Sequence, residues 1–314
     1  MTKEPNTHPK CITIHCKTAA NHVKGRFPYI WDLNIYRGCE HGCRYCFALY
    51  THKYMENQRT GCFFSIIYKK ENIAEQLERQ LASPAWKGEV INLGGVTDNY
   101  QPWEAENGLM TEVLEILIKY RNPGIISTKS DLILRDYELI DRLSRLTYVN
   151  IASTITCVDE KLAAGLEPGA VNPARRFAML KEFAKTNAST GVHSMPLIPY
   201  LTDDTANLEG LYQGAVSCGA KYLLPGYLNL KGPTREAFFE YLFKCRPYLI
   251  EKVNKLFTVK NAYKEYRIPK YVEIRQIAEK YKMPSNYMKE VPSRMPTAEN
   301  NTGAAEAGEQ LKFL

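Results

Sequence analysis

The stretch of sequence that decides the fold is Tyr36-Arg37-Gly38-Cys39-Glu40-His41-Gly42-Cys43-Arg44-Tyr45-Cys46-Phe47. Its cysteines have the spacing C-x3-C-x2-C, with an aromatic residue directly before the last one. Three thiolates on one tight loop can each bind an iron of a four-iron cluster, whereas clusters that only transfer electrons usually have four cysteines. The spacing therefore predicts an iron–sulfur cluster with one open coordination site, where chemistry can take place.

A structural zinc site is the alternative interpretation of these cysteines. Zinc needs a fourth ligand, commonly from a second C-x2-C or a pair of histidines. His41 lies inside the loop, too close to the cysteines to complete a tetrahedron easily, and the other cysteines form no second C-x2-C. A disulfide framework is disfavoured because nine cysteines is an odd number and 314 residues can bury a core without such bonds. The cluster is the favoured interpretation.

The bulk composition, with 45% hydrophobic and 24% charged residues, is that of an ordinary globular protein. The N-terminus lacks the apolar core of a signal peptide, and no segment approaches 18 uninterrupted apolar residues. Nine cysteines without a secretion signal indicate a reducing compartment. We expect a cytoplasmic protein without a membrane partner.

Apolar runs and amphipathic stretches alternate after the cysteines. Strands are expected at residues 33–36, 89–93, 125–128, 148–155, 191–198 and 221–224, and helices at 104–120, 136–146, 173–185 and from Asp203 or Asp204 to about Cys218. Repeated strand–helix units predict parallel strands, and six units fit a partial barrel better than a closed eight-stranded one. The predicted fold class is α/β, a partial (β/α)6 barrel at residues 31–230 between an N-terminal segment (1–30) and a mostly helical C-terminal extension (231–295).

Positive charge is concentrated in this C-terminal extension. Residues 231–295 carry 15 Lys and Arg against 7 Asp and Glu, and seven tyrosines are interleaved with them. Cations and aromatic rings suit single-stranded or distorted nucleic acid. A solvated Lys-rich helical face is the alternative, and we weigh the two evenly. The last segment, residues 296–314, is expected to be disordered.

Polar residues follow the expected strands at the edge where such folds bind ligands. The second strand ends in Gly94-Gly95-Val96-Thr97-Asp98, the third in Thr128-Lys129-Ser130 and the fourth in Ser153-Thr154. The glycines allow close approach of the backbone, Thr97 and Asp98 can accept from an ammonium group, and Lys129 can pair with a carboxylate. Hydroxyls such as those of Ser153 and Thr154 suit sugar or carboxylate oxygens. Together these residues predict a site for an amino acid attached to a nucleoside.

From Asp32 to about Leu230 the chain resembles the spore photoproduct lyase group of radical S-adenosylmethionine (SAM) enzymes. The resemblance rests on the cysteine motif, Thr97-Asp98-Asn99-Tyr100-Gln101-Pro102-Trp103-Glu104, the run from Thr128 to Asp136, Ser153-Thr154-Ile155-Thr156, Glu167-Pro168-Gly169-Ala170 with Arg175-Arg176, and residues 191–203. It implies a barrel of the radical SAM type, with a [4Fe-4S] cluster on Cys39, Cys43 and Cys46 and SAM on the open iron. It further implies an electron donor such as flavodoxin or ferredoxin.

The same resemblance implies roles for individual residues. Tyr45 would line the adenine, and Gly94, Gly95 and Asp98 the methionine amine. Lys129 and Ser153 would hold the carboxylate or ribose. One electron from the cluster would cleave SAM into methionine and a 5′-deoxyadenosyl radical, which abstracts a hydrogen atom from the substrate.

One departure from the group concerns the hydrogen donor. The photoproduct-cleaving lyases carry a cysteine near the end of the second strand, and residues 93–98 of this chain contain none. Cys62, Cys157 and Tyr100 are the remaining candidates. We therefore predict a radical SAM lyase-like enzyme acting on DNA or RNA, in repair or modification. Action on a small molecule or peptide, with the basic extension as a docking surface, is the alternative, and a non-catalytic cluster or zinc protein that binds nucleic acid is a third possibility.

Overall fold

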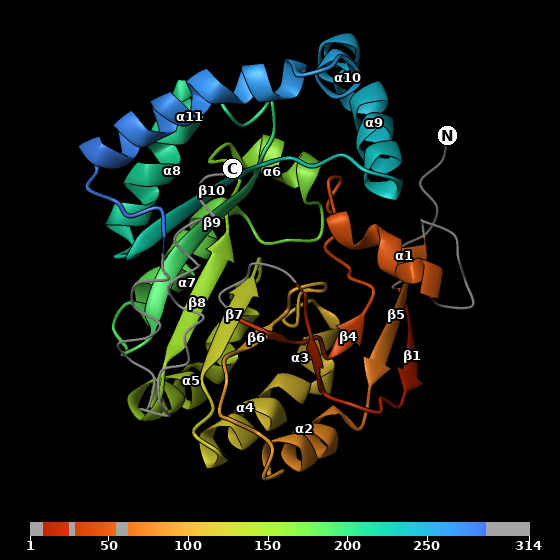
Figure 1. Ribbon diagram of the computed structural model, residues 1–314, viewed down its shortest axis with the longest axis vertical. Coiled ribbons are helices and arrows are strands. Elements are labelled where there is room, and N and C mark those ends of the chain that lie inside the picture. The colour runs from red at the N-terminus through yellow and green to blue at the C-terminus, as the bar shows by residue number, and fades with distance from the viewer. Residues whose placement is uncertain (1–8, 25–28, 55–61, 287–314) are drawn as a thin grey trace.

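A curved seven-stranded sheet forms the centre of the structure (Figure 1), a computed structural model that describes residues 9–24, 29–54 and 62–286. In sheet order its strands are β10 (Tyr222–Tyr227), β9 (Ser189–Leu197), β8 (Val149–Thr154), β7 (Gly124–Thr128), β6 (Ile91–Leu93), β3 (Trp31–Leu33) and β2 (Ala20–His22). All neighbours from β10 to β3 are parallel, and β2 joins the edge antiparallel to β3. The predicted barrel of six parallel strands is confirmed.

The first barrel strand is shorter than predicted. It ends at Leu33, and Tyr36–Arg37 form β4 of a second sheet with the order β1-β5-β4. The side chain of Asn34 accepts hydrogen bonds from the backbone of the β6 loop, so the chain turns away from the barrel after Leu33. The predicted single strand at residues 33–36 was therefore wrong, because its two ends belong to different sheets.

The second sheet also orders part of the N-terminal segment. Strand β1 (Lys10–Ile14) pairs in parallel with β5 (Ile66–Lys70), which pairs antiparallel with β4. The short helices η1 (Phe47–Tyr54) and α1 (Cys62–Ser65) lie between the cysteines and β5. These elements place a separate small sheet beside the open edge of the barrel.

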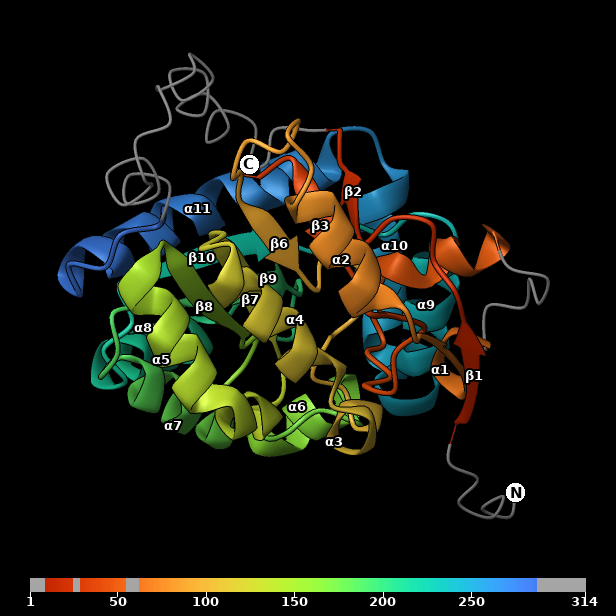
Figure 2. The ribbon, with the colours of Figure 1, turned by 90° about the horizontal axis from the view of Figure 1, so that it is seen from below.

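The outer face of the large sheet is covered by helices, as Figure 2 shows. These are α2 (Ile73–Leu81), α4 (Leu109–Lys119), α5 (Tyr137–Leu146), α7 (Pro173–Phe183) and α8 (Thr205–Ser217). On α4, the buried residues Val113, Leu114 and Leu117 recur at helical spacing and pack on the sheet. The predicted helix at 104–120 is divided by Gly108, whose φ of 66° ends α3 (Trp103–Asn107) before α4 begins.

The C-terminal extension packs along the upper edge of the barrel in Figure 1. It consists of α9 (Pro233–Cys245), η3 (Pro247–Leu249), α10 (Ile250–Thr258) and α11 (Ala262–Lys280). Phe238 and Leu242 of α9 share a buried cluster with Cys43 and Tyr45, so the extension helps to enclose the cysteines. The predicted tail at 296–314 lies outside the described residues. No helix in the described ranges is long and apolar enough to cross a membrane.

Candidate active site

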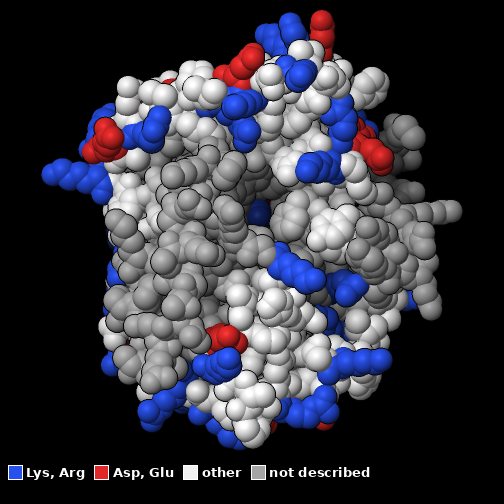
Figure 3. Space-filling model, in the orientation of Figure 1, with Lys and Arg blue, Asp and Glu red and all other residues white. Residues whose placement is uncertain are grey.

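The inner face of the sheet borders a hollow. Val149 and Ile151 pack outward against the helices, so Asn150 and Thr154, at alternate positions, belong to the inner face of β8. Figure 3 shows the hollow at the centre of this side of the molecule, with a Lys or Arg side chain visible inside it. The charged side chains nearest its rim in this view are mostly basic.

The cysteine loop, residues 38–47, follows β4 and is held tightly against two neighbouring segments. Gly38 has φ +88°, and a Cβ there would meet the carbonyl oxygen of Ile66 at 2.5 Å. A Cβ on Gly169 would meet the Glu40 carbonyl oxygen at 2.3 Å. Larger residues at either glycine would therefore push the loop away from its supports.

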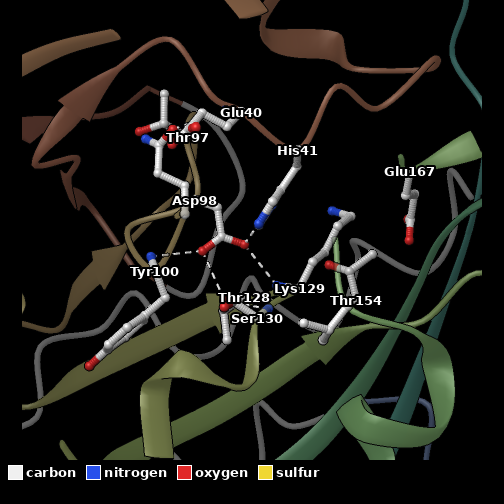
Figure 4. Close-up of polar contacts among 12 residues, drawn as sticks. Glu40, His41, Thr97, Asp98, Tyr100, Thr128, Lys129, Ser130, Thr154 and Glu167 are labelled. Atoms are coloured by element: carbon white, nitrogen blue, oxygen red, sulfur yellow. Dashed lines mark hydrogen bonds and ion pairs between the residues drawn. The ribbon is translucent and has the colours of Figure 1, made fainter. Parts of the chain in front are cut away.

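Asp98 connects the cysteine loop to the end of β7 (Figure 4). The Nδ1 of His41 lies 3.3 Å from one carboxylate oxygen, which also accepts from the Lys129 backbone N–H at 2.7 Å. The other oxygen accepts from the Thr128 hydroxyl at 2.8 Å and the Tyr100 N–H at 2.9 Å. Burial alone would raise the pKa of Asp98, but His41 lowers it overall. Both oxygens are thus occupied by the protein, and Asp98 acts as a structural anchor of the loop.

A second buried carboxylate holds the other end of the loop. The hydroxyl of Tyr45 donates to Glu167, and an Arg176 nitrogen lies 2.5 Å from Glu167 and donates to the Thr154 carbonyl at 2.8 Å. Glu167 and Arg176 are each 1% exposed. Burial, followed by the charge of Glu167, raises the pKa of Tyr45. This chain of contacts joins the loop to the end of β8.

Lys129 presents a cation to the hollow between these two anchors. Its side chain extends beside Thr154 toward the space between His41 and Glu167 (Figure 4). Burial alone would lower the pKa of Lys129, but the neighbouring Cys43 and Glu167 raise it. Among the described residues, no hydrogen-bond or ion-pair partner meets its ammonium group. Lys129 is therefore a protonated group available to an anion.

The glycine loop after β6 is positioned by two residues that the sequence patterns did not single out. Asp32 accepts from the Gly95 N–H at 3.2 Å, and Asn34 accepts from the N–H groups of Val96 and Thr97 at 2.9 and 3.0 Å. A Cβ on Gly95 would meet Asp32 Oδ1 at 2.4 Å, so the glycine permits this approach. Asp32 lies within the barrel strand β3 and Asn34 directly follows it, and this position at a strand end is the signal that could have identified them.

The remaining predicted site residues lie in different surroundings. The Ser153 hydroxyl donates to the Thr128 carbonyl at 2.9 Å, and the Tyr100 hydroxyl donates to Asp136 at 3.1 Å. Cys157 is buried, with its sulfur 3.6 Å from the Asp159 carbonyl. Cys62 begins α1, next to the contact between Phe63 and Cys39. The three hydrogen-donor candidates are thus not brought together, and their role stays a prediction.

Most tyrosines of the C-terminal extension pack inward. Asp203, after β9, accepts from the hydroxyls of Tyr266 and Tyr227 at 2.8 and 3.3 Å, and its carbonyl accepts from Lys270 at 2.8 Å. Arg267 stacks on Tyr263 at 4.5 Å. The predicted cap is Asp204, whose side chain accepts from Asn207 at 2.9 Å. These contacts fix α11 to the barrel and leave few of its rings exposed.

The donor set of the cysteine loop fits a cluster better than a single metal ion. In the described part of the chain, no three His, Cys, Asp or Glu side chains converge as ligands of one ion. In a four-iron cluster each thiolate binds a different iron, so such convergence is not required. Cys46 packs against the side-chain cluster that contains Cys43 and against the one that contains Cys39, so the three thiols lie close together.

Comparisons with known proteins agree with this geometry. A family model described as the Radical SAM superfamily matches residues 33–208. An uncharacterized protein of Mycobacterium tuberculosis is 32% identical over 251 residues, which cover 78% of this chain and 74% of the relative. One of Methanocaldococcus jannaschii is 28% identical over 234 residues, covering 74% and 82%.

Solved structures of spore photoproduct lyase have a similar fold. The lyase complexed with dinucleoside spore photoproduct has a TM-score of 0.63 at 14% identity, covering 86% of this chain and 79% of that one. A mutant lyase with bound AdoMet and the same dinucleoside has a TM-score of 0.57 at 14% identity. That match covers 75% of this chain and 66% of the mutant chain, just under two thirds of its length. At this identity the likeness is one of fold.

Proposed function

The chain belongs to the radical SAM superfamily, and we propose that it cleaves SAM reductively in order to act on a nucleic acid. It is an enzyme whose cofactors are a [4Fe-4S] cluster and SAM. When bound, these cofactors supply the one-electron cleavage of SAM that yields methionine and a 5′-deoxyadenosyl radical. Cys39, Cys43 and Cys46 would hold the cluster. The protein's own part is to bind, orient and exclude water.

The observation that carries the proposal is the ammonium group of Lys129 at the barrel mouth, for which no residue in the described part of the chain is a hydrogen-bond or ion-pair partner. We assign it to the carboxylate of SAM because a partly buried cation without a protein partner is stabilised by an anion. Thr154, on the same rim, is assigned to a ribose oxygen. Gly94, Gly95 and Thr97 would approach the methionine amine, with Asp98 acting through the loop that it anchors.

The nucleic-acid substrate is supported by charge and by the fold of the relatives. The rim of the hollow in Figure 3 is mostly basic, and residues 231–295 carry the excess of Lys and Arg. Spore photoproduct lyase, which has a similar fold, has a solved structure in complex with dinucleoside spore photoproduct. Phosphates on the substrate would pair with these cations. The nine cysteines are consistent with a reducing compartment such as the cytoplasm. Tyr100 and Cys157 are buried and could serve as hydrogen donors only if substrate binding exposes them, whereas Cys62 is already partly exposed.

The packing of the extension favours a second candidate, a small molecule or peptide substrate. The hydroxyls of Tyr227 and Tyr266 donate to Asp203, and that of Tyr263 donates to a backbone carbonyl of the barrel. Tyrosines held in this way offer no platform for stacking bases. If the extension binds nucleic acid, we expect Lys260, Lys264, Arg267 and Lys270 to contact its phosphates. Of these four cations, only the first two are exposed. The basic extension would then serve mainly as a structural and docking element.

An anaerobic assay tests both the chemistry and the substrate class. The reconstituted protein is given dithionite and SAM, with and without single-stranded DNA or RNA, and 5′-deoxyadenosine is measured by mass spectrometry. We expect Lys129→Met to raise KM for SAM by roughly 10- to 100-fold, the value of a charge-assisted hydrogen bond, and Lys181→Met on exposed α7 to leave it unchanged. An unchanged KM in Lys129→Met would refute the assignment, and stimulation by a small metabolite rather than nucleic acid would favour the second candidate.

A further inference from the structure

A tyrosine with a strained backbone, Tyr200, lies just beyond the end of the barrel strand β9. The Leu201 N–H donates to the Ile198 carbonyl at 3.0 Å and closes a turn over residues 198–201. Pro199 occupies the second position of this turn, and Tyr200, with φ +65°, occupies the third. These are the features of a type II turn, whose third position is normally glycine or asparagine because its φ is positive. A bulky side chain is an outlier at such a position.

The conformation of Tyr200 is not explained by the end of a helix. In the described part of the chain, the other non-glycine residues with positive φ are Arg121, Asn261 and Lys282. Arg121 and Lys282 directly follow the C-caps of α4 and α11, where the left-handed conformation is common. Asn261 is a residue type that tolerates this conformation. Strain without such a local reason is typical of functional sites.

The turn is held in place by the buried carboxylate of Asp203 and by α11. The Tyr200 N–H donates to Asp203 at 2.8 Å and to the hydroxyl of Tyr266 at 3.3 Å. Tyr266 donates to the same carboxylate at 2.8 Å. On the other side of the turn, the Ile198 N–H donates to the Thr202 hydroxyl at 2.8 Å. The backbone is therefore fixed from both sides, which sets the direction of the Tyr200 side chain.

The ring of Tyr200 remains accessible. Tyr200 is 41% exposed, whereas the neighbouring Tyr227 and Tyr266 donate their hydroxyls to Asp203. The centroids of the Tyr200 and Tyr266 rings lie 4.9 Å apart with the ring planes at 62°, an edge-type contact rather than a stack. No hydrogen bond within residues 9–24, 29–54 and 62–286 involves the Tyr200 hydroxyl. An accessible ring on a fixed backbone suits the binding of another planar group, because little conformational freedom remains to be lost.

Tyr200 belongs to the edge of the barrel at which we place SAM. Parallel strands bring their carboxyl ends to the same edge, where such folds bind ligands. Thr154 ends β8 and pairs in register with His193 of the neighbouring β9, and Lys129 follows β7. The turn with Tyr200 comes directly after β9, so the ring lies at the rim of the hollow. The adjoining helix α11 carries the exposed Lys264, a cation for a nearby phosphate.

We propose that Tyr200 stacks on an unpaired base of the nucleic-acid substrate and holds that base at the rim of the hollow. This inference rests on the proposed function and deepens it, because it names the part of the nucleic acid that the rim binds. Every base has a face on which an aromatic ring can stack, so the contact tolerates different sequences. In an intact duplex both faces of a base are already stacked. The substrate is therefore single-stranded or locally opened.

Binding of two single-stranded DNA probes tests the proposal. The probes have equal length, one with bases and one fully abasic, and their affinity for the reconstituted full-length protein is measured by fluorescence anisotropy. Tyr200→Ala should weaken binding of the base-containing strand about tenfold, as for the loss of one stacked base, and leave the abasic strand unaffected. Tyr200→Trp should bind both strands as the wild type does. Tyr248→Ala is the matched control, because it removes a ring that is 69% exposed on η3, and it should change neither affinity.

A glycine at position 200 separates the ring from the strain. Tyr200→Gly removes the ring as Tyr200→Ala does, but glycine adopts a positive φ without a steric penalty. We expect the same loss of affinity in both variants, with a higher urea midpoint of unfolding for Tyr200→Gly. Asn261→Gly has the same φ of +65° and should leave binding unchanged. Wild-type affinity in Tyr200→Gly would overturn the proposal, since the backbone conformation rather than the ring would then control binding.

The remaining outcomes distinguish the stacking contact from the proposed substrate class. If the wild type binds the base-containing strand and Tyr200→Ala binds it equally well, the stacking contact is refuted and the nucleic-acid substrate stands. Equal weakening of the abasic strand in Tyr200→Ala would also refute the contact, because the effect would not depend on bases. If the wild type binds neither strand, the nucleic-acid substrate itself is refuted.

Discussion

The cysteine loop and helix α11 both combine charged residues with tyrosines, but they use them in opposite ways. Around the loop, Asp98 and Glu167 are buried and paired with His41 and Arg176. On α11 the charges reach the surface and the tyrosines turn inward toward Asp203. A buried ion pair must be placed accurately, because leaving one partner unpaired is costly, whereas a surface charge tolerates many positions. Short sequence motifs therefore predict the positions of residues near the loop. In the extension, composition alone does not distinguish a nucleic-acid-binding surface from a solvated helical face.

We expect the largest effect of any substitution in the cysteine loop at the cysteines themselves. In the variant Cys39→Ala, Cys43→Ala, Cys46→Ala we expect complete loss of bound iron and of 5′-deoxyadenosine formation, because these three thiolates are the ligands that we assign to the cluster. Iron analysis after anaerobic reconstitution and mass spectrometry measure the two losses. A variant that still cleaved SAM under reductant would contradict the cluster assignment. Circular dichroism provides the control that the barrel remains folded.

The next largest effect is expected at Glu167. Glu167→Gln leaves Arg176 buried without its counter-charge, and we expect a loss of about 3 kcal/mol in the free energy of unfolding, measured by urea denaturation. Glu182→Gln is the matched control, since it removes an exposed carboxylate paired with Lys185 on the surface of α7. This change should have little effect. Equal losses in the free energy of unfolding in the two variants would show that the buried pair at Glu167 contributes no more to stability than the surface pair at Glu182.

A smaller effect is expected where the extension joins the barrel. Asp203→Asn keeps the size of the side chain but weakens acceptance from the hydroxyls of Tyr266 and Tyr227. We expect a loss of about 2 kcal/mol, with hydrogen exchange faster in α11 than around the cysteine loop. Uniform acceleration across both regions would mean that α11 and the loop unfold as one unit. Asp204→Asn serves as the control because asparagine also caps helices well.

The same division explains what could be predicted from the sequence. The parallel strand–helix order and the position of Lys129 directly after β7 were predictable because local periodicity determines them, whereas the roles of Lys129 and the cysteines stay predictions. Strand β4 was not, because its partner β5 lies about thirty residues further along and no local pattern distinguishes the two sheets. Asp203 looked like a helix cap, but its role depends on Tyr266, which is more than sixty residues away. Residues whose function depends on such distant partners carry no local signature.

The smallest expected change concerns Lys260 and Lys264, the two exposed cations of the set that we tie to nucleic acid. Lys260→Gln with Lys264→Gln should leave stability unchanged, because neither residue is buried. If both contact phosphates of a single strand, the slope of log K against log salt should decrease by about 1.4, close to 0.7 for each contact. Lys87→Gln with Lys181→Gln removes the same charge elsewhere on the surface and should leave the slope unaltered. An equal change of slope in both double variants would show that the extension attracts nucleic acid only through the net charge of the protein. The extension would then differ from the cysteine loop in how its residues are packed and would not contain a binding site.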